Sequence, residues 1–204
     1  MQAVCSGFTY GMTAANGLIE TGLDRVLVIG ADALSKYIDW EDRTTAILFG
    51  DGAGAVVLER HEEQHLLSFD LGADGKTRHI GYTNHSDKIR IDGKEVFRHA
   101  VRAVTKSSKN AFERAGVTAD EIDWFIPHQA NVRIIESVAG RLGLSMDQTV
   151  VTIGETANNS AATIPMALDT AIGDDRVQPG DLLLLAGFGF GMTWASSVVR
   201  WNPS

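Results

Sequence analysis

A cysteine, a histidine and an asparagine, far apart in a chain, are the side chains from which a thiol nucleophile and its helpers are built. Cys5 is the only cysteine among the 204 residues, His128 lies in the stretch FIPHQAN, and Asn158 stands beside Asn159. In such a set the cysteine is the nucleophile, and N–H donors of the helpers stabilise negative charge on a carbonyl oxygen. The residue types therefore favour nucleophilic catalysis through sulfur.

Cys5 stands directly before a predicted helix, TYGMTAANGLIETG, which Gly22 ends. Unpaired N–H groups and the dipole at a helix start favour a thiolate, so we expect the pKa of Cys5 to lie below about 8.5. The alternative is that Cys5 is a small buried hydrophobic side chain, as cysteine often is.

His128 follows a short predicted strand that ends at Pro127, because proline cannot donate to a ladder. Asn131 is the predicted N-cap of the next helix. A histidine at such a corner is fixed in direction and can still reach a cleft. One hypothesis is that it satisfies only its neighbours. The other is that it donates, together with Asn158, to one carbonyl oxygen and stabilises an enolate.

The elements that position these residues alternate between strands and helices, so the class is α/β. Strands are predicted over 25–32, 66–74, 124–128, 150–153, 181–188 and 193–201, and helices over 93–115, 131–144 and 160–172. Residues 45–50 and 55–60 are predicted to form a hairpin about the turn DGAG. TADEID resembles a capping box, and residues 72–90 are predicted to form a long surface loop.

The composition limits the function classes. Hydrophobic residues make up 44% and charged residues 22%, as in globular chains with a core. The net charge of −8 leaves no basic field for phosphates, so we expect no nucleic-acid partner. A single cysteine excludes an internal disulfide and fits the cytoplasm. No apolar run reaches membrane-spanning length and MQAVCSGF is no signal peptide, so no membrane is expected.

Three glycine or histidine motifs imitate known sites. HEEQH over 61–65 matches the zinc motif H-E-x-x-H, but two predicted strands leave no room for its helix, so we predict a solvated turn and no metal site. Gly187, Gly189 and Gly191 resemble part of a dinucleotide fingerprint, which needs a helix where a strand follows here. GDGAGA over 50–55 is likewise predicted to be a turn between strands.

Several segments together resemble β-ketoacyl-acyl-carrier-protein synthase III, in order and over essentially the whole chain: AVCSGFTYG, DRTTAILFGDGAGAVVLE, PHQANVRII, ANNSAATIP and GFGFGMTWAS. The resemblance implies the thiolase fold, with five layers α-β-α-β-α built from two similar halves. It implies decarboxylative condensation of a short acyl-CoA primer, such as acetyl-CoA, with malonyl-acyl-carrier protein at the start of fatty-acid synthesis. It also implies a cytoplasmic homodimer with no permanently bound cofactor.

The resemblance assigns roles to single residues. Cys5 accepts the acyl group, and His128 with Asn158 serves decarboxylation of the malonyl thioester. The backbone N–H groups of Cys5 and Phe190 form the oxyanion hole. The CoA and pantetheine contacts are Arg43, Gly93, Asn131 and Arg133; the acyl passage is lined by Leu34, Phe49, Phe97 and Phe188; the carrier-protein patch is Arg98, Arg133 and Arg141.

The chain departs from the family pattern in three ways. Ala157-Asn158-Asn159 stands where the family has Gly-Asn-Thr, so Asn159 competes with Asn158. Phe190 occupies a small-residue position and can reshape the pocket. About a hundred residues that precede the family's cysteine have no counterpart here, so we expect a truncated protein whose isolated fragment is inactive. Residues 1–60 are then the remainder of the first half, 61–92 a connecting loop region, and 93–204 the second half.

Two alternatives stay open. One is a related ketosynthase or acyltransferase of secondary metabolism that uses the same triad on another primer. The other is a non-catalytic truncated remnant that acts only through dimerisation.

Overall fold

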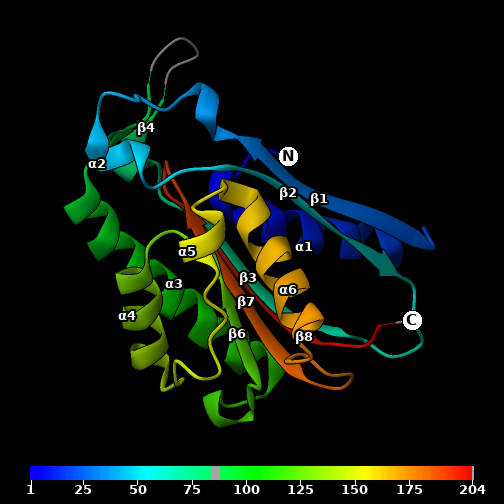
Figure 1. Ribbon diagram of the computed structural model, residues 1–204. Coiled ribbons are helices and arrows are strands. Elements are labelled where there is room, and N and C mark those ends of the chain that lie inside the picture. The colour runs from blue at the N-terminus through cyan, green and yellow to red at the C-terminus, as the bar shows by residue number, and fades with distance from the viewer. Residues whose placement is uncertain (84–87, 204) are drawn as a thin grey trace.

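Two β-sheets enclose one pair of helices, and a second pair covers the other face of the larger sheet (Figure 1). The computed structural model describes residues 1–83 and 88–203. In the smaller sheet, β1 (Arg25–Ala33) pairs antiparallel with β2 (Asp51–Glu59). The larger sheet has the order β3 (Leu66–Ala73), β8 (Thr193–Arg200), β7 (Leu182–Gly189) and β6 (Trp124–Pro127).

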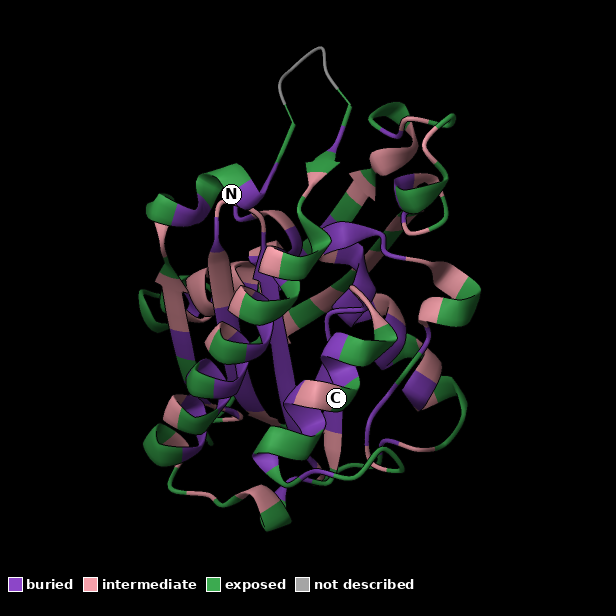
Figure 2. Ribbon diagram, turned by 90° about the vertical axis from the view of Figure 1, so that its left-hand side faces the viewer, coloured by how far each residue is buried: buried purple, intermediate pink, exposed green. Residues whose placement is uncertain are grey.

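The enclosed helices are α1 (Gly7–Glu20) and α6 (Thr163–Gly173), and the outer pair is α3 (Gly93–Ala115) and α4 (Val132–Leu142). In the larger sheet β6 runs parallel to β7, whereas β8 runs antiparallel to both of its neighbours. Because helices cover both faces of this sheet, every residue of β7 is buried. Buried residues accordingly concentrate in the central strands (Figure 2).

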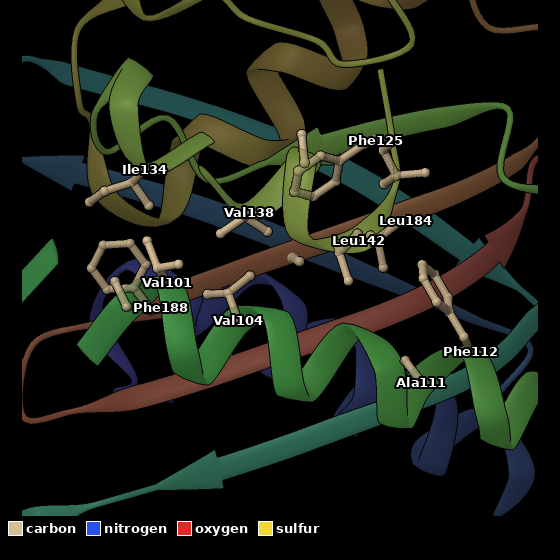
Figure 3. Close-up of a cluster of buried hydrophobic side chains, with 14 of the residues drawn as sticks. Val101, Val104, Ala111, Phe112, Phe125, Ile134, Val138, Leu142, Leu184 and Phe188 are labelled. Carbon is tan, nitrogen blue, oxygen red and sulfur yellow. The ribbon is translucent and has the colours of Figure 1, made fainter. Parts of the chain in front are cut away.

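Two main hydrophobic cores lie on the two faces of the larger sheet. One packs α3 and α4 against the sheet through residues such as Val101, Val104, Phe125 and Leu184 (Figure 3). The other lies between the two sheets, where Phe8 and Met12 of α1 meet Ile164 of α6. The described residues thus form four of the five layers of the expected thiolase-like arrangement.

The outward side of the smaller sheet is exposed. Leu27, Ile29 and Val57 keep 58%, 61% and 62% of their surface accessible, whereas Val28 on the inward side is buried. The sequence RVLVIGAD, which is almost wholly apolar, indicates a strand buried on both faces, and in this respect the expectation for 25–32 is wrong. A strand forms, but the described residues cover only one of its faces.

Most predicted elements are confirmed, including the helix over 93–115, the Asn131 N-cap and the capping box at 118–121. The predicted hairpin over 45–60 is wrong, because DGAG lies inside the continuous strand β2 and residues 43–46 form the short helix α2 (Arg43–Ala46). The predicted strand over 150–153 is also wrong. Only Thr149 bridges to the sheet, and α5 (Ile153–Thr156) begins at once.

The predicted loop over 72–90 contains more structure than expected. A 3₁₀ segment (Gly75–Ile80) leads into a two-stranded ribbon of β4 (Gly81–Tyr82) and β5 (Arg90–Ile91). Residues 84–87 of that loop lie outside the described residues. None of the helices in the described part of the chain combines the length and apolar character that crossing a membrane requires.

Gly30 of β1 provides a test of the packing between the smaller sheet and the loop at 160–162. A Cβ atom at Gly30 would overlap the carbonyl oxygen of Ala161, so we expect Gly30→Ala to lower the free energy of unfolding by about 1–3 kcal/mol. Exposed Gly17 of α1 has no heavy atom near its Cβ position, so Gly17→Ala should instead stabilise by about 0.5–1 kcal/mol. Urea unfolding of both variants measures the difference, and equal stability of Gly30→Ala and the wild type would contradict the contact.

Candidate active site

Cys5 lies in a 3₁₀ turn (Val4–Ser6) immediately before α1. The turn is anchored at Ala3, whose carbonyl oxygen accepts from the hydroxyls of Ser6 at 2.8 Å and Thr193 at 2.9 Å. Val4 adopts a φ of 50°, a left-handed conformation that is rare for a β-branched residue. Such strain persists where surrounding contacts enforce it. Here those contacts hold the turn that places the buried Cys5 just before α1.

His128 follows the last residue of β6, as the sequence predicts, and its side chain is buried. Its backbone N–H donates to the carbonyl of Ala186 on β7 at 2.8 Å, which continues the parallel pairing. Its ring lies edge-on to Phe188, with centroids 5.6 Å apart. Nδ1 lies 2.6 Å from the hydroxyl oxygen of Thr163, whereas Nε2 has no hydrogen-bond partner among the described residues.

Asn158 is held by backbone and side chain at once. Its backbone exchanges hydrogen bonds with the segment around Phe49, through Leu48 O at 2.9 Å and Gly50 N at 3.0 Å. Its side-chain Oδ1 accepts from the backbone N–H of Ser160 at 2.9 Å. Because the oxygen is engaged, the amide nitrogen is the end of the side chain left to donate.

Gly187 of β7 brings the cysteine and the histidine together. A Cβ atom at this position would lie 3.1 Å from the Cβ of His128 and 3.6 Å from the carbonyl oxygen of Cys5. The hydroxyl of Ser160, two residues from Asn158, hydrogen-bonds the thiol of Cys5. The structure therefore places Cys5 and His128 on either side of Gly187, and the segment that begins at Asn158 reaches both of them through Ser160 and Thr163. Sequence reasoning missed Ser160 and Thr163, whose only signal was their closeness to Asn158 in the chain.

Asn159 points elsewhere. Its Nδ2 donates to the carbonyl of Thr156 at 3.0 Å, and its side chain packs against Gly52 of β2. The role of Asn158 as the partner of His128 stays a prediction.

Burial raises the pKa of the Cys5 thiol to about 12, and the nearby Asp32 carboxylate adds to the rise. The hydroxyl of Ser160 acts in the opposite direction but does not offset the burial. The expectation of a lowered pKa is therefore wrong. The position at a helix start is as predicted, but the loss of water outweighs the effect of that position.

Burial also lowers the pKa of His128 to about 3. The imidazole is therefore neutral at any ordinary pH and carries one N–H and one lone pair. The site holds a neutral thiol, a neutral imidazole and a neutral amide.

The residues expected to bind CoA and the carrier protein lie at helix starts and on the surface. Figure 3 shows α4 and α3 facing each other in the same chain direction, with Ile134, Val138 and Leu142 opposite Val101, Val104 and Ala111. Gly93 and Asn131 therefore lie at the same end of the helix pair. Arg43, Arg98, Arg133 and Arg141 are exposed.

Some of these side chains already have partners. Arg98 pairs with Glu95 at 2.6 Å, and the side chain of Asn131 caps α4 by accepting from the N–H of Arg133 at 2.9 Å. Arg141 lies eight residues beyond Arg133, about 12 Å along the helix axis. The three predicted carrier-protein arginines are therefore spread along two helices.

The residues expected to line the acyl passage lie in three places. Phe49 and Leu34 belong to a small cluster with Ile38, next to Asn158, and Phe188 contacts His128. Phe97 stays exposed, at 37%.

Phe190 packs its ring against Gly81, where an added Cβ atom would lie 2.6 Å from the ring. Gly189 lies close to the amide of Cys5, because its Cβ position is 2.9 Å from Cys5 N. The oxyanion-hole role of the Phe190 N–H stays a prediction.

HEEQH forms a bend between β2 and β3 rather than a helix. His61 and His65 contact each other, with Nδ1 and Nε2 3.2 Å apart. Within residues 1–83 and 88–203, no three His, Cys, Asp or Glu side chains gather in a way that would hold a metal ion.

Comparison with known proteins agrees with this fold and site. The family model "3-Oxoacyl-[acyl-carrier-protein (ACP)] synthase III" matches residues 1–75, and that for the C terminal of the same family matches residues 112–201. The chain is 45% identical to the β-ketoacyl-[acyl-carrier-protein] synthase III of Jannaschia sp. (strain CCS1), over 98% of this chain and 66% of the relative. It is 47% identical to that of Rhizobium meliloti (strain 1021), over 98% and 67%.

A crystal structure of 3-oxoacyl-[acyl-carrier-protein] synthase III from Aquifex aeolicus VF5 superposes with a TM-score of 0.96 at 42% identity, covering 98% of this chain and 66% of that one. The layers are those of a thiolase-fold protein. The chain belongs to the β-ketoacyl-acyl-carrier-protein synthase III family, and it spans about two thirds of the length of the curated relatives it matches.

The single cysteine makes the pKa of Cys5 directly testable. With a pKa near 12, little thiolate exists at pH 8, so iodoacetamide should alkylate the folded chain about a hundredfold or more slowly than the urea-unfolded chain. The rate in the folded chain should still rise above pH 9, where the unfolded chain has levelled off. Mass spectrometry of quenched samples follows the reaction, and a plateau near pH 8 in the folded chain would show that the thiolate is stabilised instead.

Proposed function

We propose that the protein catalyses decarboxylative condensation of a short acyl-CoA primer with malonyl-acyl-carrier protein, the step that initiates fatty-acid synthesis. The observation that carries this proposal is a buried site in which Cys5 and His128 lie on either side of Gly187, and in which the segment that begins at Asn158 contacts both through Ser160 and Thr163. The relatives' shared name, β-ketoacyl-[acyl-carrier-protein] synthase III, supports the same reaction.

In the first half-reaction, the sulfur of Cys5 attacks the carbonyl carbon of the acyl-CoA thioester. The bond to the CoA sulfur breaks, and the proton that leaves Cys5 ends on the CoA thiol. The product is an acyl thioester on Cys5. Backbone N–H groups near Cys5 and Gly189 supply donors for the oxygen that becomes negative during the attack.

In the second half-reaction, the malonyl thioester loses CO₂ and its carbonyl oxygen takes up the charge of an enolate. Neutral N–H donors from His128 and Asn158 stabilise this oxygen. Donors that the protein holds in place stabilise a developing charge more strongly in a buried site than in water. The enolate carbon then attacks the acyl group, and the sulfur of Cys5 leaves and takes up a proton.

The partners follow from the reaction. An acidic carrier protein and the CoA phosphates would meet the exposed cations Arg43, Arg98 and Arg133 near the starts of three helices. Cytoplasmic location and a homodimer belong to the same proposal, supported by family membership and, for the location, by the single cysteine.

A related ketosynthase of secondary metabolism would use the same three residues, and identities of 45–47% to synthase III proteins favour the fatty-acid reaction. A non-catalytic remnant would have no need for a histidine and an asparagine held this rigidly. A panel of acyl-CoA primers distinguishes the fatty-acid reaction from the secondary-metabolism alternative. Absence of any acyl transfer would support the non-catalytic remnant.

We expect labelled acetyl-CoA to acylate Cys5 and Cys5→Ser to abolish the label. His128→Ala and Asn158→Ala should keep acyl transfer but lose malonyl decarboxylation by about a hundredfold or more, since each removes a donor to the second carbonyl. Asn159→Ala, the matched control, should lose much less.

Activity is measured in this chain preceded by the first third of the Aquifex aeolicus synthase, because the chain spans only part of its relatives' length. The isolated chain, assayed in parallel, is expected to be inactive. Label retained in Cys5→Ser would contradict the nucleophile, and greater damage by Asn159→Ala would reassign the amide.

Charge reversal at Arg98 or Arg133 should raise KM for the carrier protein about tenfold while kcat changes little, because surface charges mainly steer encounter. Lys109→Glu is the matched control on the same helix as Arg98, about 16 Å further along its axis. Kinetics at low and high salt give the test. Equal effects at all three positions would show that net charge, and not a docking patch, is responsible.

A further inference from the structure

Thr163, the first residue of α6, is the only described side chain that hydrogen-bonds the His128 ring. Its Oγ1 lies 2.6 Å from Nδ1 of His128 and 3.0 Å from the carbonyl oxygen of Ser160. Both side chains are almost completely buried. The Nε2 atom on the other side of the ring is buried and unpartnered among the described residues.

The proton of the Thr163 hydroxyl has two possible acceptors, and the choice decides the tautomer of His128. If it goes to Ser160 O, then Oγ1 must accept from an Nδ1–H, and Nε2 carries a lone pair. If it goes to Nδ1, then Nε2 carries the hydrogen. A neutral imidazole offers no third arrangement with a hydrogen bond between these two side chains.

One distance and one backbone hydrogen bond favour donation to Nδ1. A separation of 2.6 Å is shorter than the usual range of about 2.7–3.2 Å for N–H···O, but it fits a hydroxyl donor. The carbonyl of Ser160 already accepts the backbone N–H of Thr163, so it does not depend on the hydroxyl.

We infer that Thr163 is a positioning residue that donates its hydroxyl proton to Nδ1 of His128 and thereby fixes the hydrogen on Nε2. This inference rests on the proposed function for its consequence: with the hydrogen on Nε2, the ring presents a donor to the enolate oxygen beside the amide of Asn158. The opposite tautomer would present a lone pair to that oxygen and repel it. Thr163 therefore decides whether His128 helps or hinders decarboxylation.

The matched variants are Thr163→Val, which keeps the shape and removes the hydroxyl, and Thr163→Ser, which keeps the hydroxyl. Thr170→Val is the control, because the hydroxyl of Thr170 bonds only to Met166 O in its own helix, at 3.0 Å. The chain is labelled with ¹⁵N-histidine, and one-bond N–H correlations show which ring nitrogen of His128 carries the hydrogen.

We expect hydrogen on Nε2 in the wild type, Thr163→Ser and Thr170→Val, and a substantial Nδ1–H population in Thr163→Val. Hydrogen on Nδ1 in the wild type would overturn the inference. So would a Thr163→Val spectrum identical to that of the wild type.

Kinetics in the hybrid enzyme used above give a second readout. Malonyl decarboxylation should fall about tenfold or more in Thr163→Val and recover in Thr163→Ser, with acyl transfer to Cys5 unchanged in both. Equal losses of both half-reactions would indicate a merely structural role and overturn the inference. If the wild type fails to decarboxylate while Nε2 carries the hydrogen, the proposed function fails and the tautomer assignment stands.

Discussion

Exclusion of water from the space around Cys5 and His128 is the constraint on which the rest of the site depends. The same burial raises the pKa of the thiol to about 12 and lowers the pKa of the imidazole to about 3. Both groups are therefore neutral, and a full charge forms only when a substrate reacts. A donor in such a place is worth more than one in water, because no solvent screens it. It must also be oriented by the protein, since water cannot do so.

Glycines make this burial possible by letting backbone segments approach where a side chain would separate them. Gly187 lets the Cys5 turn and His128 approach each other, and Gly189 lies against the backbone of Ala3 and Cys5. In the smaller sheet, Gly30 lies against Ala161, just before α6, and Gly54 lies against Pro165 at the start of α6. The enclosed helices are thus fixed against both sheets. This packing therefore both positions the residues of the site and removes them from solvent.

Much of the arrangement was predictable from sequence because local signals and global packing agree. Pro127 ends a strand and Asn131 begins a helix, so His128 had to lie at a corner. The failures occur where tertiary contacts decide. DGAG has turn composition, yet its glycines serve the approach of α6 within a strand. The pKa of Cys5 was misjudged because a pattern can locate a helix start but cannot show that the larger sheet and the 158–163 segment enclose it.

The segment 158–163 orients the reacting groups more than the strands that carry them do. The backbone N–H of Ser160 turns the amide of Asn158, and the hydroxyl of Ser160 bonds the thiol of Cys5. Three residues later Thr163 holds the ring of His128. Positive φ values at Ala157 and Ser160, 58° and 53°, are the local strain that lets one short segment face all three side chains. Because one segment carries Asn158 and contacts both Cys5 and His128, a shift in it would disturb all three side chains together. The mutual geometry of the site therefore depends on the start of α6 being rigid, and this helix is packed between the two sheets.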